Sequence, residues 1–182
     1  NKFEQITTKN LLALFCFHLA RIPAKVKDNK IISFFDQDKT YWNKDFMKLG
    51  FHYLEKPNKL NKYYVEALIA SKHMTYTKNG NQHWNEIIKL YQLLLSVSNS
   101  PIMKLNLCYC LIKAHRIEEA KELLEIVENE LPNEHIYLSL VKANIFKNKK
   151  GLESEKIVAQ VLKNINQKIR RVYILENMST GF

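Results

Sequence analysis

The sequence contains little glycine and little proline, with four residues of each among 182. So few turn-forming residues argue against a disordered chain and against an all-β fold with many tight turns. Apolar residues make up 46% of the chain, and a chain of this length can bury a sizeable core as one domain. The composition therefore favours a folded, mainly helical protein.

The sequence also lacks a long apolar run. Its most apolar stretch, residues 11–17, is shorter than the roughly 18 residues that a membrane span needs. The arrangement of a secretory signal, with a basic start, an apolar middle and a small-residue cleavage site, is not evident either. We therefore expect a cytoplasmic protein without a membrane partner.

Cysteine is scarce, and the three residues of this type, Cys16, Cys108 and Cys110, lie in apolar stretches. Their odd number and their setting favour buried free thiols over disulfides. On a helix, the Cys108-x-Cys110 spacing would place the two thiols about 200° apart, so they could not share a metal ion.

Motifs of catalytic and metal-binding sites are missing as well. The sequence has no HExxH, no paired CxxC and no glycine-rich phosphate loop. His18, Asp36, Asp38 and His73 could form an acid/base or metal cluster, but their spacing matches no recognised site. We therefore expect no enzyme activity, no cofactor and no metal.

Basic residues are in excess, and the net charge of +10 is unevenly distributed. Residues 1–60 carry 11 basic and 6 acidic side chains, whereas residues 101–133 carry 4 and 6. This balance permits contact with nucleic acid or an acidic protein surface, although simple solvation of scattered lysines is the plainer interpretation. Because no DNA-reading module is evident, we expect at most salt-sensitive, sequence-independent help in DNA binding. The candidate contacts to phosphate or to an acidic partner are Lys142, Lys147, Lys149, Lys150, Arg170 and Arg171.

From residue 61 onward, apolar residues recur at helical spacing, which predicts helices in antiparallel pairs. Ser100 suits an N-cap and Pro101 the first helical position, so one helix should begin there. The helix over 102–114 is apolar on all sides and should be buried on several of them. The expected helices span residues 62–77, 84–95, 102–114, 117–131, 135–147, 152–163 and 167–177.

The first sixty residues follow a different pattern. A helix over residues 11–20 should end at Pro23, and an extended hairpin is expected near residues 24–36. A further helix is expected from about residue 40 to 54. Asp38 precedes this helix, where an acidic N-cap residue would favour the helix dipole.

The helix pairs have a period of 34 residues. In the unit 101–134, small residues at Cys108 and Ala120 and a late proline at Pro132 resemble the tetratricopeptide repeat. Stacked pairs of this kind bury a core that no single pair could bury alone. We therefore expect an all-α fold with one domain over 1–182, in which antiparallel helix pairs stack as a tetratricopeptide-like right-handed array.

Five motifs occur in a familiar order and at familiar spacings. They are "HLARIPAK" (18–25), "FFDQDKTYWN" (34–43), "YYVEALIASKH" (63–73), "WNEIIKLYQLLL" (84–95) and "SPIMKLNLCYCL" (100–111). Together they resemble the C-terminal extension of a subgroup of extracytoplasmic-function (ECF) RNA polymerase sigma factors. Lys39 and Leu107 stand where that family has arginine, and Asn43 where it has aspartate. The matching residues are His18, Arg21, Asp36, Gln37, Asp38, Trp42, His73, Trp84, Tyr91, Ser100, Pro101, Leu105 and Asn106.

The resemblance implies a regulatory, protein-binding domain that modulates transcription initiation. Its expected partners are sigma regions 2 and 4 of the same protein and core RNA polymerase, with a DGPF (YCII-related) protein as a further candidate. Sigma regions 2 and 4, which contact promoter DNA, are not found in this sequence, so we expect it to be part of a longer factor. The alternative is a free-standing tetratricopeptide-like scaffold or a separate effector of a sigma factor.

The resemblance also implies that the Asp-Gln-Asp element forms a polar latch between the hairpin and the helices. A buried carboxylate needs a partner, and Arg21, His18 and His73 are the candidates. We expect an Arg21–Asp36 or Arg21–Asp38 pair, whose loss would lower stability by roughly 3 kcal/mol if the pair is buried. The full predicted cluster, structural or interacting in role, is His18, Arg21, Asp36, Gln37, Asp38, Trp42, His73, Ser100, Pro101 and Asn106.

Overall fold

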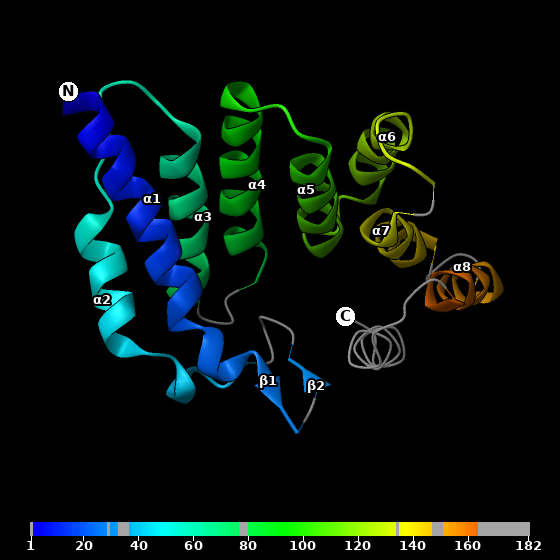
Figure 1. Ribbon diagram of the computed structural model, residues 1–182. Helices are drawn as coiled ribbons and strands as arrows, with labels where there is room; N and C mark the ends of the chain where they lie inside the picture. Colours follow the sequence, from blue (N-terminus) through cyan, green and yellow to red (C-terminus); the bar gives the residue numbers. More distant parts are fainter. Residues whose placement is uncertain are drawn as a thin grey trace. The chain divides into compact units, whose positions relative to one another are not determined.

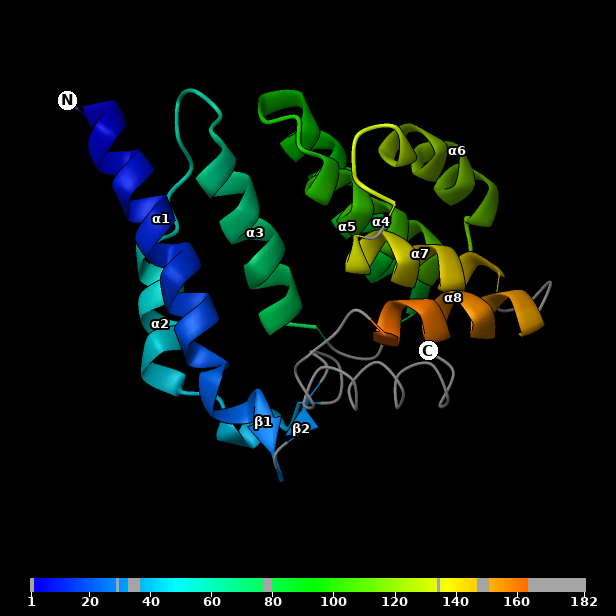
Figure 2. The same ribbon diagram turned by 45° about the vertical axis from the view of Figure 1, so that its right-hand side comes forward.

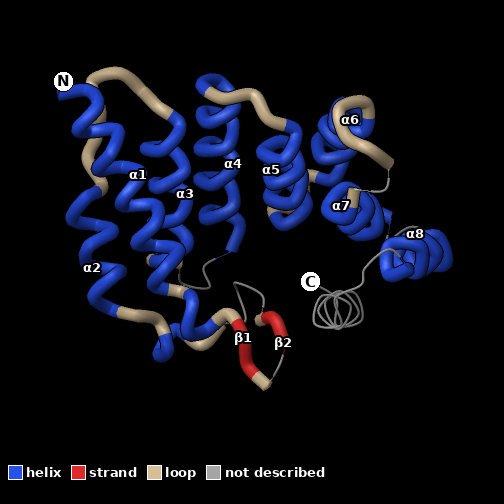
Figure 3. The backbone as a smooth tube through the Cα atoms, in the orientation of Figure 1, coloured by secondary structure: helices blue, strands red, loops and turns tan. Residues whose placement is uncertain are grey.

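The fold is seen in a computed structural model, which describes residues 2–28, 30–32, 37–76, 80–133, 135–146 and 151–163 (Figure 1). Helices dominate these residues, and two short strands accompany them (Figure 3). The predicted all-α class is therefore confirmed, whereas the helix expected over 167–177 lies outside the described residues. Within the described ranges, none of the helices combines the length and the apolar character needed to cross a membrane. The α-helices are α1 (Lys2–Ala20), α2 (Lys44–Tyr53), α3 (Lys62–Met74), α4 (Gly80–Val97), α5 (Pro101–Lys113), α6 (Ile117–Glu128), α7 (Ile136–Phe146) and α8 (Gly151–Lys163).

A short hairpin follows α1. The 3₁₀ turn η1 (Ile22–Ala24) leads into β1 (Val26–Lys27), which pairs with β2 (Lys30–Ile31). Asp28 has a φ of 50°, the left-handed conformation that two-residue hairpin turns require. The predicted hairpin is confirmed around Asp28, but its expected start is wrong because Ala24 belongs to η1.

The segment that was expected to form one helix over 40–54 forms two elements. Asp38 precedes the 3₁₀ turn η3 (Lys39–Tyr41), and α2 begins only at Lys44. Asn43 caps α2, because its Oδ1 accepts hydrogen bonds of 3.0 Å from two backbone N–H groups of the first turn. Two cap residues, Asp38 before η3 and Asn43 before α2, therefore divide the segment into two elements.

The chain divides into two compact units, residues 1–28 with 32–99 and residues 29–31 with 100–182. In the first unit α1 packs against both α2 and α3, and α3 packs against α4 (Figure 2). In the second unit α5 packs against α6 and α7 against α8, and α7 also contacts α5 and α6. The packed helix pairs agree with the sequence pattern, whereas the single domain and the right-handed array stay predictions.

The core of the first unit depends on a close approach of α1 and α2. Phe17 of α1 is fully buried and packs edge-on against Phe51, with ring centroids 5.0 Å apart. Gly50 lies directly on that ring, since a Cβ atom at Gly50 would be 2.6 Å from Cε1 of Phe17. Carbon atoms in contact normally lie about 3.5–4.0 Å apart. Glycine therefore allows the two helices to meet here.

A buried asparagine ties the segment after α2 to α1. Asn10 is completely buried, and its Nδ2 donates to the carbonyl oxygen of Glu55 at 2.9 Å. In return, Oδ1 of Asn10 accepts a hydrogen bond of 3.0 Å from the backbone N–H of Glu55. Lys9 adds an ion pair of 2.6 Å with the Glu55 carboxylate. Both polar groups of Asn10 are thus satisfied, as a buried amide requires.

The second unit buries the positions that suggested a repeat. Cys108 of α5 and Ala120 of α6 are both completely buried, and these two helices pack against each other. Small side chains at such positions let neighbouring helices approach closely. Five residues around the circumference of α5 are buried, which confirms that this helix is enclosed on several sides: Leu105, Leu107, Cys108, Cys110 and Leu111.

Candidate functional site

The predicted latch is centred on glutamine. Arg21, which follows α1, donates through Nε to Oε1 of Gln37 at 3.3 Å. Nε2 of Gln37 donates to the carbonyl oxygen of Ile32 at 3.2 Å, and Gln37 is only 7% exposed. Gln37 therefore connects the end of α1 with the end of the hairpin segment. Burial lowers the pKa of Arg21 to about 10, so its guanidinium stays charged at neutral pH.

Asp38 has a local role instead of pairing with Arg21. Its carboxylate accepts hydrogen bonds from the backbone N–H of Thr40 at 2.9 Å and from the Thr40 hydroxyl at 2.7 Å. The hydrogen bond from the hydroxyl and that from the backbone hold the pKa of Asp38 below its ordinary value. Asp38 is therefore a cap residue, but of η3 and not of the longer helix expected over 40–54, which Asn43 caps. The described partner of its exposed carboxylate is Thr40 and not Arg21, so the predicted Arg21–Asp38 pair is wrong. Asp36, and with it the Arg21–Asp36 alternative, lies outside the described residues.

A histidine pair lies between α3 and α4. Nδ1 of His73 and Nε2 of His83 are 3.3 Å apart, a distance at which one ring donates and the other accepts. Burial, and then the charges of His83 and Arg21, lower the pKa of His73 to about 3. The ring of Tyr76 lies 4.3 Å from that of His83, and the Trp84 ring lies 5.3 Å from it. His73 is thus a neutral, half-buried member of an aromatic cluster.

Lys39 links this aromatic cluster to η3. Its Nζ donates to the carbonyl oxygen of Tyr76. The same ammonium lies 5.3 Å from the ring centroid of Trp42 and 5.9 Å from that of Tyr76, within the range of cation–π attraction. Trp42 itself is 2% exposed and belongs to the core of the first unit. Lys39 is exposed, yet its ammonium group contacts both Tyr76 and Trp42.

The remaining predicted residues do not join this latch. The His18 side chain is exposed on the surface, yet its neighbours partly desolvate the ring, and this effect, followed by the charges of Arg21 and Lys25, lowers its pKa. Ser100, Pro101 and Asn106 belong to the second unit, where Ser100 precedes α5 without a side-chain cap bond, Pro101 opens the helix and Asn106 is exposed.

Of the six basic residues predicted to contact phosphate or an acidic partner, Lys142 lies within the described part of the chain. Lys142 of α7 forms an ion pair of 2.7 Å with Glu128 of α6, and its side chain is 24% exposed. This pair connects two helices, so Lys142 already has an anionic partner inside the protein. The other five, Lys147, Lys149, Lys150, Arg170 and Arg171, lie outside the described residues.

The three cysteines are free and buried, as predicted. Burial raises the pKa of Cys108 and of Cys110 to about 12, so both are protonated thiols at neutral pH. Since the thiolate is the reactive form, neither is suited to be a nucleophile or a metal ligand. In the part of the chain that the structure describes, no group of three or more His, Cys, Asp or Glu residues could hold a metal ion.

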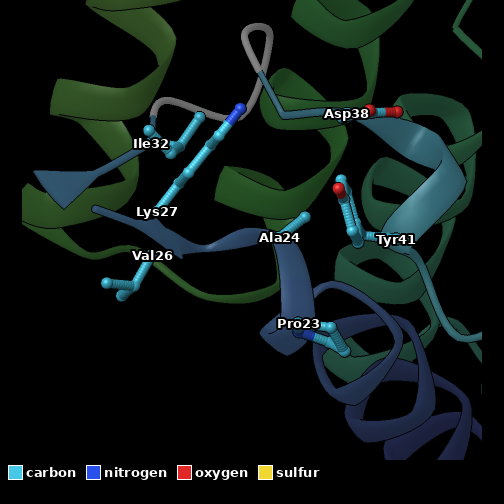
Figure 4. Close-up of a pocket in the computed structure, with 7 residues that line it drawn as sticks. All are labelled: Pro23, Ala24, Val26, Lys27, Ile32, Asp38 and Tyr41. Atoms are coloured by element: carbon cyan, nitrogen blue, oxygen red, sulfur yellow. The ribbon is translucent and has the colours of Figure 1, made fainter. Parts of the chain in front are cut away.

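A pocket of about 270 Å³ opens between η1, the hairpin segment and η3 (Figure 4). Its apolar lining comes mainly from Pro23, Ala24, Val26 and Ile32, while Lys27, Asp38 and Tyr41 contribute polar groups. Sequence reasoning missed this pocket, as it missed His83 and Asn10.

Comparison with known proteins identifies one segment. Residues 2–58 match the model of a family of unknown function, DUF6596. The match covers α1, the hairpin, η3 and α2, which include Arg21, Gln37 and Trp42 of the latch. No curated protein and no solved structure shows significant similarity to the chain.

Proposed function

We propose that the chain is a regulatory, protein-binding domain of an ECF RNA polymerase sigma factor and acts in the cytoplasm. One observation carries the proposal. Motifs that are far apart in the sequence supply neighbouring side chains in the first unit. Arg21 of the first motif bonds Gln37 of the second, and the rings of His73 and Trp84, from the third and fourth motifs, lie 6.3 Å apart. This convergence supports the view that the ordered motifs belong to one inherited domain.

The proposed mechanism is intramolecular docking. The domain would contact sigma regions 2 and 4 or core polymerase and so determine whether they engage the promoter. A DGPF (YCII-related) protein is proposed as a further partner that delivers a signal. Promoter DNA would be read by the sigma regions, since Lys142 is paired with Glu128.

A binding role is also better supported than catalysis. Asp38 is engaged by Thr40, and the pKa of His73, at about 3, keeps that ring neutral. The thiols of Cys108 and Cys110 are protonated at neutral pH. A general base or nucleophile instead needs a pKa near the working pH.

The test is a promoter assay on the full-length factor. Transcription from its own promoter is compared for the intact factor and for a version that lacks residues 1–182, at matched protein levels. We expect output to change by about tenfold or more in either direction, as loss of a few kcal/mol of docking energy would cause. Unchanged output would refute the proposal.

The alternative is a tetratricopeptide-like scaffold or separate effector, favoured by the full burial of Cys108 and Ala120 in the α5–α6 pair. The coding sequence upstream of Asn1 distinguishes the two. A helix-turn-helix region encoded there supports the sigma factor, and a start codon just before Asn1 supports the scaffold.

A further inference from the structure

A second apolar stripe runs along α1 and into η1, on residues that stay exposed. Leu12, Phe15 and Leu19 follow one another at intervals of three and four residues, which places them on one side of α1, and Ile22 of η1 follows three residues later. Phe15 is 53% exposed and Ile22 is 54% exposed. The core residue Phe17 is fully buried on another side. Two sides of α1 are thus apolar. The helix packs against α2 and α3, and among the described residues the side that carries Leu12, Phe15 and Leu19 stays exposed.

The stripe has the dimensions of a helix-binding surface. From Leu12 to Ile22 it extends about 15 Å, close to three turns of a partner helix. Single exposed apolar residues are common on protein surfaces, but an aligned set of large ones marks an interaction site. Amphipathic helices recognise such surfaces with their own residues at intervals of three and four.

The pocket continues this stripe. Ile22 is followed by Pro23, which lines the 270 Å³ pocket together with Val26 and Tyr41 (Figure 4). Val26 is 53% and Tyr41 60% exposed, so the apolar surface extends past the end of α1. A pocket at the end of an apolar stripe suits one large anchor side chain of a partner, the usual source of binding energy at interfaces.

Cations lie at the pocket end of the stripe. Lys27 lines the pocket, and Lys25 precedes Val26 in the chain. The positive charges of both lysines act on neighbouring groups. Lys25 helps to lower the pKa of His18, and Lys27 helps to lower the pKa of Asp38. Asp38 on the same pocket keeps its negative charge while it accepts from Thr40, so it offsets one of the two lysines. Together with the net charge of +10, this favours an acidic partner and disfavours a second copy of the same chain.

We propose that the exposed stripe of α1 and the adjoining pocket bind an amphipathic helix of a partner protein, with Asp or Glu residues flanking its apolar stripe. The proposal rests on the proposed protein-binding function and names the surface and the partner chemistry. The partner helix lies along Leu12, Phe15, Leu19 and Ile22, inserts one apolar side chain beside Tyr41, and places its carboxylates near the two lysines.

The test is a binding titration of the full chain with two designed, fluorescently labelled helical peptides of about 18 residues, long enough to form a helix. Both peptides carry leucine at intervals of three and four residues. The positions that flank the leucines are all Glu in one peptide (the Glu peptide) and all Lys in the other. We expect the Glu peptide to bind at least about tenfold more tightly by fluorescence anisotropy. The double variant Phe15→Ser/Ile22→Ser should weaken Glu-peptide binding by about tenfold or more, whereas Lys25→Glu/Lys27→Glu should reverse the preference.

A matched control is Ile126→Ser, which removes a 51% exposed isoleucine from α6. It should leave peptide affinity unchanged, and all variants should keep the thermal unfolding midpoint of the parent. Absence of Glu-peptide binding, equal affinity for both peptides, or stripe variants that bind like the parent would overturn the proposal. So would a dimer in sedimentation that the Phe15→Ser/Ile22→Ser variant dissociates, because a second copy would then cover the stripe.

The peptide-binding test and the promoter assay can fail independently of each other. If removal of residues 1–182 changes promoter output while the stripe variants bind the Glu peptide normally, the proposed function stands and this inference fails. If the stripe variants lose the Glu peptide while removal of the domain leaves promoter output unchanged, the surface is established and the link to transcription fails.

Discussion

The contact of Gly50 with Phe17 predicts that Gly50→Ala destabilises the first unit. The new methyl group would lie 2.6 and 2.7 Å from two ring carbons of Phe17 and 3.0 Å from a third. The ring cannot move aside easily, because Phe17 is fully buried and packs against Phe51. The helices must therefore separate or the ring must leave its preferred rotamer.

The expected magnitude follows from two opposing terms. Overpacking of a core costs about 1–3 kcal/mol, and distances this short place Gly50→Ala at the upper end of that range. Alanine is favoured over glycine inside a helix by about 1 kcal/mol. The net loss in the free energy of unfolding should be about 2 kcal/mol. Urea unfolding followed by tryptophan fluorescence is a suitable assay, because both tryptophans, Trp42 and Trp84, lie in the first unit.

A double-mutant cycle tests the cause. Phe17→Val removes the three ring atoms closest to Gly50 and should itself cost about 3 kcal/mol. In that background Gly50→Ala should be neutral or stabilising by up to about 1 kcal/mol, because only the helix-propensity term remains. If the two substitutions instead add to within about 0.5 kcal/mol, the steric explanation is refuted.

Three further predictions concern the latch, the histidine pair and the thiols. Gln37→Leu should lower the free energy of unfolding by about 1–3 kcal/mol in urea titrations, because it removes two part-buried hydrogen bonds; a loss below about 0.5 kcal/mol would contradict the latch. The free energy of unfolding should fall as the pH drops below 6.5. His73 contributes at most about 1.4 kcal/mol per pH unit, because its pKa of about 3 in the folded chain means that only the unfolded chain protonates this ring between pH 6.5 and 3. His73→Gln should flatten that slope, and the matched change His52→Gln on the exposed surface of α2 should not. Cys108 and Cys110 should react with a thiol reagent only after unfolding, since both are buried thiols with pKa values near 12; rapid reaction of the folded chain would contradict this.

Gln37 and Asp38, which are neighbours in the chain, have different roles in the Asp-Gln-Asp element. The sequence favoured a buried Arg–Asp pair, which would have made the latch an ion pair with a high desolvation cost. Among the described residues, the neutral amide of Gln37 joins the two segments, because it accepts from Arg21 and donates to Ile32 with one side chain. Asp38 meanwhile stays in water and stabilises η3. The buried Gln37 thus connects two segments, whereas the next residue, the exposed Asp38, caps a turn.

The features that the sequence alone determined are local ones. The helical class, the opening of α5 at Pro101 and the turn at Asp28 depend on dihedral preferences, caps and periodicity, which act within a few residues. The apolar faces of α6 could be read in the same way, and Ala120 is buried as its spacing predicts.

Tertiary structure decided which distant groups meet. Nothing near Asn10 indicates that it bonds the backbone of Glu55, and nothing near His73 indicates His83 as its partner. Such pairings depend on how helices pack, because a buried polar group takes whichever donor or acceptor the fold brings within about 3 Å of it. The same holds for Gly50, whose need to be glycine arises only where the ring of Phe17 crosses it.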